Sequence, residues 1–200
     1  DFSRNEVATA ATVVIRPNQV AEVDGTAIYA DLRVRRALQL AIDNQQILDI
    51  GYAGRGSVAE NHHVGPMHPE YSPMEPPQHD PAAALALMEE AGLGDFEHEL
   101  VCDNEPWRSD TADAAAAMLR AAGIKVRRVN YPGSTFYNNW SDYPFSTTNW
   151  NHRPLAVQMF ALAYRSGAAW NEFGFANAAF DRLLDQALAT ADVAARQQIV

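Results

Sequence analysis

The chain has 200 residues, of which 48% are hydrophobic and 20% are charged. This composition is typical of a folded globular protein and excludes a disordered one. Its 15 Lys and Arg residues against 25 Asp and Glu give a formal net charge of −10, so we expect no binding to nucleic-acid phosphates. The single cysteine, Cys102, excludes an internal disulfide and a multi-cysteine metal site, and no apolar run reaches the roughly 18 residues of a membrane-spanning helix.

The first third of the chain predicts one strand and two helices. Residues Val7–Ile15 are rich in β-branched side chains and predict a strand that stops at Arg16 and Pro17. Residues Asp31–Ile42 place apolar side chains on one helical face, with Asp31 as the N-cap. Asp43 starts a second helix, because Asp43–Gln46 has the spacing of a capping box.

A long segment rich in glycine, proline and histidine follows, at Gly51–Gln78. Loops of this length inside a compact domain are uncommon and are often functional, and its prolines favour an ordered path. Asp80 and Pro81 then begin a helix that ends at Gly92, since Asp caps and Pro suits the first helical position.

The second half predicts a βαβ unit. Residues 96–102 alternate as in a strand, Asp110–Ala122 form an alanine-rich helix that ends at Gly123, and Ile124–Val126 begin another strand. Residues Phe145–Trp150 predict a further strand, and helices start at Asn177 and Asp192. We therefore expect an α/β fold with parallel strands and helices on the sheet faces.

The histidines and carboxylates are the candidates for metal binding or catalysis. His62 and His63 are adjacent, and neighbouring side chains of an extended segment point apart, so they make a poor chelate by themselves. A zinc- or nickel-binding role for the loop histidines nevertheless stays open. A hydrolase could use Asp103 and Glu105, at a strand end where exposure is expected, whereas Cys102 is expected to be buried and inert.

Aromatic residues are concentrated near the end of the chain: eleven of the nineteen fall between Phe136 and Phe175. Two short segments within this region combine an indole with an amide and a charge, and both follow predicted strands or turns. Such corners supply the apolar walls and the few polar groups of a small-molecule cleft, although the tryptophans could instead fill the core. The candidate ligand-binding residues are Trp150, Asn151, Arg153, Trp170, Asn171 and Glu172.

Four segments, in this order, resemble the family 5 extracellular solute-binding proteins of ABC transporters, the dipeptide and oligopeptide type. They are DLRVRRALQLAID at 31–43, DPAAALALMEEAG at 80–92, LRAAGIKV at 119–126 and NAAFDRLL at 177–184, the last followed by Arg196. The resemblance covers about residues 10–200. It implies that residues 1–200 form a single lobe, the C-terminal ligand-binding lobe of a larger two-lobe protein, with a type II periplasmic-binding-protein-like fold whose mixed sheet has flanking helices.

The resemblance also implies a function and a location. A protein of this kind captures a small solute, peptide-like or another polar organic molecule, between two lobes and delivers it to membrane permease subunits. It is periplasmic or otherwise extracytoplasmic, has no enzymatic activity and needs no cofactor. The aspartate that holds the amine of a bound peptide in peptide-binding members has no counterpart in Thr148–Pro154, and a buried ammonium without a counter-charge is costly. The loop residues Asn61, His62 and His63 are expected to approach the cleft between the lobes.

Overall fold

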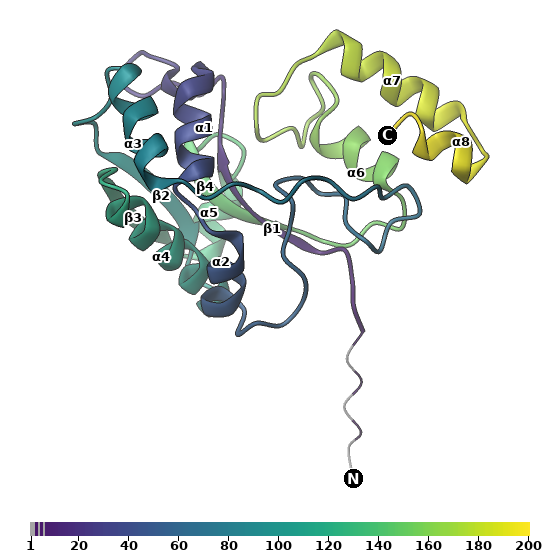
Figure 1. Cartoon of the computed structure of the whole chain (residues 1–200), viewed down its shortest axis with the longest axis horizontal. Helices are drawn as coiled ribbons and strands as arrows, with labels where there is room; N and C mark the ends of the chain where they lie inside the picture. The colour runs from purple at the N-terminus through teal and green to yellow at the C-terminus, as the bar shows by residue number, and fades with distance from the viewer. Residues whose placement is uncertain (1–2, 4, 6) are drawn as a thin grey trace.

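The computed structural model describes residues 3, 5 and 7–200, and it contains one four-stranded mixed sheet with helices on both sides of it (Figure 1). The strands are β1 (Thr12–Pro17), β2 (His98–Asp103), β3 (Val126–Tyr131) and β4 (Phe145–Trp150), and their order in the sheet is β1-β4-β2-β3. Strand β2 is parallel to both β3 and β4, whereas β1 runs antiparallel to β4 at one edge. The expected α/β fold with a mixed sheet is confirmed.

Helices α1–α4 lie beside the sheet, and α6–α8 form a second group on the other side of β1 and β4 (Figure 1). The first group consists of α1 (Leu32–Leu40), α2 (Asn44–Gly51), α3 (Pro81–Glu90) and α4 (Pro106–Ala121), with a short 3-10 helix η1 (Ile28–Ala30) before it. The remaining helices are α5 (Gly133–Asn138), α6 (Ala156–Ala163), α7 (Ala178–Ala189) and α8 (Val193–Gln197). None of the helices in the described part of the chain is long and apolar enough to cross a membrane.

The predicted caps place the helix starts correctly. Asp31, Asp80, Asn177 and Asp192 each accept a hydrogen bond from a backbone N–H in the first turn of the helix that follows. Asp43 does the same for α2, but the capping box is incomplete, because the Gln46 side chain donates to the Asp43 carboxylate instead of accepting the backbone N–H of Asp43. These caps satisfy N–H groups that have no partner within the helix.

Strand β1 differs from the prediction at both ends. It begins at Thr12 instead of Val7, and it includes Arg16 and Pro17. Thr12 pairs with Trp150 and Pro17 with Phe145, so the six residues of β4 set the length of β1. Proline is tolerated because β1 is an edge strand, where one side of the backbone needs no ladder bond.

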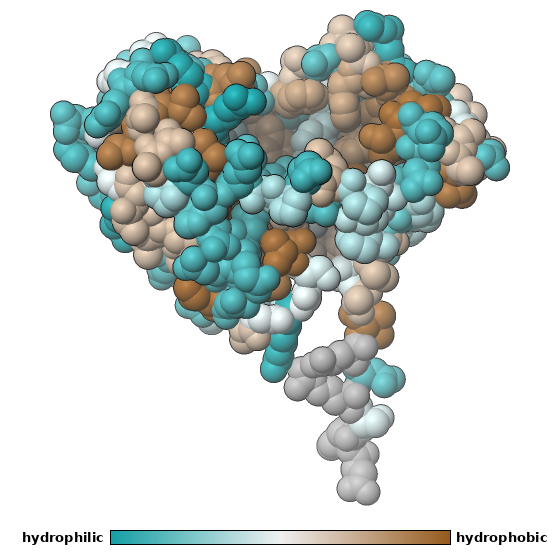
Figure 2. Space-filling view, viewed as in Figure 1, coloured by the Kyte–Doolittle hydropathy of each residue, from teal (hydrophilic) through white to brown (hydrophobic). Residues whose placement is uncertain are grey.

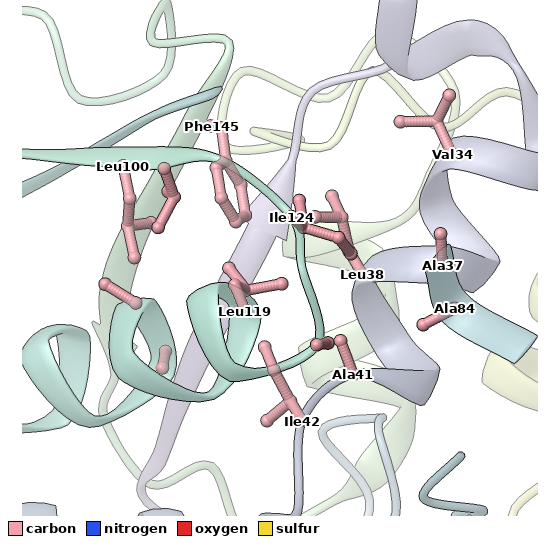
Figure 3. Close-up of a cluster of buried hydrophobic side chains, with 14 of the residues drawn as sticks. Val34, Ala37, Leu38, Ala41, Ile42, Ala84, Leu100, Leu119, Ile124 and Phe145 are labelled. Atoms are coloured by element: carbon pink, nitrogen blue, oxygen red, sulfur yellow. The ribbon is translucent and has the colours of Figure 1, made fainter. Parts of the chain in front are cut away.

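The main hydrophobic core lies between the sheet and helices α1, α3 and α4 (Figure 3). Alanines supply much of the helix surface, with Ala37, Ala41 and Ala84 fully buried, which lets α1 and α3 approach each other closely. The larger side chains Leu100, Leu119 and Phe145 fill the space between α4 and the strands. Two smaller clusters, around Trp150 and around Leu184, hold α6 and α7.

The long loop between α2 and α3 is free of helix and strand, as predicted, and it crosses to the second group of helices (Figure 1). Buried Glu70 ties it there: Oε1 lies 2.6 Å from Nε of Arg196 in α8, and Oε2 accepts the backbone N–H of Ala156 at the start of α6. The ion pair is almost fully buried. It fixes the loop, which begins at α2 and ends at α3, to helices α6 and α8 of the second group.

Candidate functional site

The carboxyl ends of the parallel strands β2 and β4 meet at the same edge of the sheet, where ligands of open α/β sheets usually bind. Trp150 is the last residue of β4, and only 5% of its surface is exposed. Its indole Nε1 donates a hydrogen bond to Glu172 Oε1 at 2.6 Å, and Thr148 Oγ1 donates to the same oxygen at 2.7 Å. The Trp150 indole is therefore buried and has an internal hydrogen-bond partner.

Glu172 contacts side chains of both β4 and β1 and is fully buried. Its Oε2 is 2.7 Å from Nε of Arg16, which is also buried, on β1. Burial lowers the pKa of Arg16, and the negative charge of Glu172 opposes that effect. The sequence suggested that Glu172 would provide a charge to the ligand, and the structure instead engages its carboxylate with Arg16, Thr148 and Trp150.

An aromatic cluster surrounds the Trp150 indole. Trp140 and Trp170 both meet it edge to face, with ring centroids 6.3 and 6.1 Å away. Trp170 is 47% exposed, so one of the two predicted tryptophans lies inside and the other at the surface. The pair offers an exposed apolar ring that is held by a buried one.

His63 packs edge to face against Trp150 as well, and its Nδ1 lies 2.6 Å from the Tyr164 hydroxyl. Burial, together with the smaller effect of charge on His62 and His68, lowers the pKa of His63 to about 4. The ring is therefore neutral at neutral pH. Its Nε2 is buried and has no hydrogen-bond partner among the described residues.

The remaining predicted site residues of the aromatic region are placed differently from one another. The Asn171 amide binds the carbonyls of Arg165 and Phe175, so it shapes the turn that carries Trp170. Asn151 is exposed. Arg153 is half-buried and donates only to the carbonyls of Asn151 and His152; in the described part of the chain it has no carboxylate within ion-pair distance.

The loop residues face separate partners. Asn61 is exposed, has a φ of 61°, and its side-chain oxygen accepts a hydrogen bond from Asn44. His62 Nε2 lies 3.4 Å from Glu60 Oε2, whereas His63 faces the aromatic cluster. Among residues 3, 5 and 7–200, no group of three or more His, Cys, Asp or Glu side chains is placed to hold a metal ion. The geometry therefore gives the loop-histidine metal site no support.

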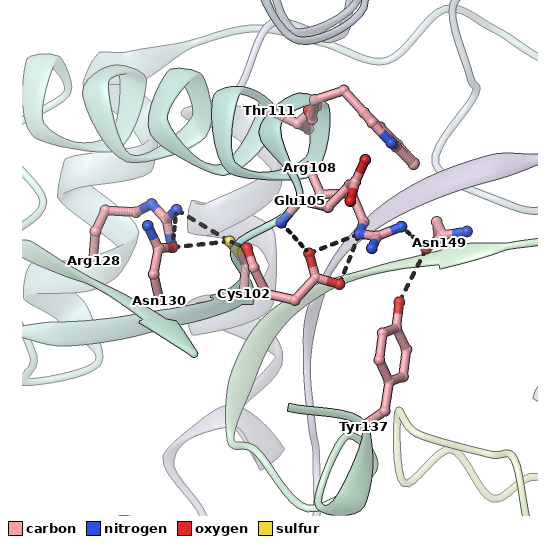
Figure 4. A network of polar contacts seen from close by, with 10 residues as sticks. Cys102, Glu105, Arg108, Thr111, Arg128, Asn130, Tyr137 and Asn149 are labelled. Carbon is pink, nitrogen blue, oxygen red and sulfur yellow. Dashed lines mark hydrogen bonds and ion pairs between the residues drawn. The ribbon is translucent and has the colours of Figure 1, made fainter. Parts of the chain in front are cut away.

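A second polar cluster at this edge was missed by the sequence analysis (Figure 4). Asp103, at the end of β2, was expected to be exposed, but it is buried. Arg108 of α4 pairs with its carboxylate at 2.7 Å. Arg108 also donates to Asn149 Oδ1 of β4, which accepts a hydrogen bond from the Tyr137 hydroxyl as well. The Arg108 guanidinium lies over the Trp107 ring, 5.0 Å from its centroid, in a cation–π contact.

This arrangement bears on the hydrolase alternative. Asp103 Oδ1 accepts the backbone N–H of Glu105, and the carboxylate is held by Arg108, while the Glu105 side chain is exposed. Two carboxylates that work as acid and base need different environments that face one substrate. Asp103 instead joins α4 to the sheet.

Cys102 is buried, as expected, and burial raises the pKa of its thiol, so the thiolate is disfavoured.

The surface is hollowed between the sheet with α1–α4 and the group α6–α8 (Figure 2). An apolar groove lies elsewhere, on the second group, and is lined by Phe160, Phe180, Leu183 and the last residues of the chain. A shallow hollow between α2 and α4 contains Ile50 and two aspartates. Neither of these two involves the tryptophan cluster.

Comparison with known proteins identifies the class. The model of the bacterial extracellular solute-binding proteins, family 5 (middle region), matches residues 2–172. Among solved structures, the chain is similar to NikZ from Campylobacter jejuni in complex with Ni(L-His), with a TM-score of 0.82, 20% identity, and coverage of 96% of this chain and 41% of that one. It is also similar to the oligopeptide-binding protein AppA from Bacillus subtilis in complex with a nonapeptide (0.81, 20%, 97% and 42%).

A third similar structure is AgaA from A. tumefaciens R10 in complex with agropinic acid, with a TM-score of 0.80, 23% identity, and coverage of 96% of this chain and 40% of that one. No curated protein sequence matches the chain. The fold is thus that of the solute-binding proteins of ABC importers, and the expected periplasmic-binding-protein-like fold is confirmed. The chain belongs to the bacterial extracellular solute-binding proteins, family 5. It spans about two fifths of the length of these solved structures.

Proposed function

We propose that residues 1–200 form one lobe of a two-lobe solute-binding protein that captures a small polar organic molecule outside the cytoplasm and delivers it to the permease of an ABC importer. Membership of a family of substrate-binding proteins supports this role. The observation that carries the proposal is the exposed Trp170 indole, which the buried Trp150 supports at the strand edge where such folds bind ligands. The three similar structures hold a nickel complex, a peptide and agropinic acid, so the fold itself does not fix the solute.

The residues assigned to the solute are those whose side chains are not already engaged. Trp170 is the apolar wall, exposed Asn151 offers a donor and an acceptor, and Arg153 offers a cation that pairs with no carboxylate of the described residues. Trp150, His63, Asn171 and Glu172 support this surface from behind. Asn61 and His62 lie in the loop that crosses between the two groups of helices, and we assign them to the rim of the solute-binding surface.

The test uses the intact protein, purified without refolding and examined by native mass spectrometry for a bound small molecule that denaturation releases. We expect a bound mass in the unaltered protein and its loss in Trp170→Ala. Tyr52→Ala is the matched control, because Tyr52 is a similarly exposed aromatic residue at the end of α2 that packs on Trp107. A mass that both variants retain equally, or turnover of the bound molecule, would contradict the proposal.

A further inference from the structure

The end of β1 is bonded to two loops that are distant in the sequence. Arg16 Nη1 donates to the backbone carbonyls of Glu172 at 2.6 Å and Tyr143 at 3.1 Å, and Nη2 donates to the carbonyl of Trp140. Two residues further, the backbone N–H of Asn18 donates to the carbonyl of Pro144. One buried guanidinium therefore holds the loop before β4 and the loop after α6 in a fixed relation.

Glu172 connects this guanidinium to the tryptophans. Its Oε2 pairs with Arg16, and its Oε1 accepts from the Trp150 indole at 2.6 Å. An indole has a single hydrogen-bond donor, so this contact fixes the orientation of the ring within its plane. A hydrogen bond to a charged acceptor is stronger than one to a neutral acceptor, and burial removes the competition from water.

The orientation of Trp150 matters for the exposed ring beside it. Trp170 meets Trp150 at 67° between the ring planes, and Trp140 meets it at 68° from another side. Trp170 also lies two residues before Glu172 in the same loop, and Arg16 donates a hydrogen bond to the backbone carbonyl of Glu172. A change in Glu172 would therefore alter both the support of the Trp170 ring and the loop that carries it.

We propose that Glu172, held by Arg16, is a positioning residue: it sets the geometry of the Trp150–Trp170 pair and so controls solute affinity without touching the solute. The statement rests on the proposed function for its effect on affinity, and on the geometry alone for its effect on the indoles. Replacing a purely structural ion pair would change the stability of the protein and leave the indole environment as it is. Buried ion pairs can be replaced without loss of the fold, so the two roles can be separated by experiment.

The chain contains a matched control for this distinction. Glu70 and Arg196 form another buried ion pair, with Nε and Oε1 2.6 Å apart against 2.7 Å for Arg16 Nε and Glu172 Oε2, and no aromatic ring donates to the Glu70 carboxylate among the described residues. Glu70→Gln and Glu172→Gln each remove one buried charge from a Glu–Arg pair and keep the shape of the side chain. Both are expected to lower the urea midpoint of the intact protein.

Only Glu172→Gln is expected to change the tryptophan readouts. These are the near-ultraviolet circular dichroism of the indoles, quenching of tryptophan fluorescence by acrylamide, and retention of the co-purified molecule in native mass spectrometry. We expect altered indole bands, increased quenching and about tenfold weaker retention, which is the change that 1.4 kcal/mol produces. Indole bands and retention like those of the unaltered protein, or equal changes in Glu70→Gln, would overturn the proposal.

A second variant covers the case in which Glu172→Gln does not fold. Thr148→Val keeps the side-chain volume and the Arg16–Glu172 pair but removes the second donor to Glu172 Oε1. We expect smaller changes of the same sign in the indole bands and in quenching, and unchanged bands would overturn the proposal. If the unaltered protein carries no solute, the proposed function fails, whereas the effect of Glu172 on the indoles is still measured by the two spectroscopic readouts.

Discussion

Acidification is expected to destabilise the fold through two buried neutral histidines. His63 packs among Trp150, Tyr164 and Phe173, and His98 on β2 lies against Phe96 with its Nδ1 3.0 Å from a tyrosine hydroxyl. Burial lowers the pKa of each from 6.5 to about 4. Both rings would have to gain a charge in a buried site, and among the described residues neither is paired with a carboxylate.

The size and sign of the effect follow from the pKa difference between the folded and unfolded states. One pKa unit corresponds to about 1.4 kcal/mol, so each histidine is linked to roughly 3 kcal/mol. Between pH 4 and 6.5 the unfolded state binds more protons than the folded state, so the free energy of unfolding falls as the pH is lowered through that window. The contribution is complete above pH 6.5 and is lost by about pH 4.

The assay is urea unfolding of the intact protein at about pH 7.5 and about pH 4.5, followed by circular dichroism. Carboxylates also titrate at low pH, so the comparison is made between variants. His63→Gln and His98→Gln are each expected to reduce the loss of stability on acidification by about 2 kcal/mol. The exposed His79→Gln is the control and should behave like the unaltered protein. An unchanged pH dependence in both buried variants would refute the reasoning.

Three further predictions concern packing, reactivity and the polar cluster. Gly51→Ala is expected to destabilise by about 1–3 kcal/mol in urea unfolding, since its Cβ would overlap with Oγ1 of Thr111; an unchanged midpoint contradicts this contact. Cys102 should react with a thiol reagent only at the rate of unfolding, because its thiol is buried and its pKa is raised, and rapid labelling of the folded protein would show otherwise. Asp103→Asn should lower the free energy of unfolding by about 1–3 kcal/mol, because it leaves Arg108 without its ion-pair partner. An unchanged free energy of unfolding would contradict this role of the pair.

Local patterns predicted most of the elements. Phe145–Trp150 was identified to the residue, and the caps at Asn177 and Asp192 mark the starts of α7 and α8. The extent of β1 was not predictable from its own residues, because Val7–Ala11 have strand propensity but no partner strand opposite them. Register with β4, and not propensity, decides where β1 begins.

The candidate site was predicted less well, because long-range contacts decide which polar groups are engaged. Glu172 and Arg16 are 156 residues apart, and no local spacing indicates that they form a buried pair. Nor does the position of Trp150 at a strand end reveal that its indole finds an acceptor 22 residues later. Arg108, which follows Asp103 by five residues at the start of a helix, had a local pattern that could have identified the polar cluster.

The central claim is that the exposed Trp170 ring, supported from behind, contacts a solute. A crystal structure of the intact protein with its co-purified molecule tests this most directly. We predict atoms of that molecule within about 4 Å of the Trp170 indole, the usual distance of apolar contact, and none in contact with the Glu172 carboxylate. A solute bound elsewhere, or a Trp170 ring covered by the protein itself, would contradict the account.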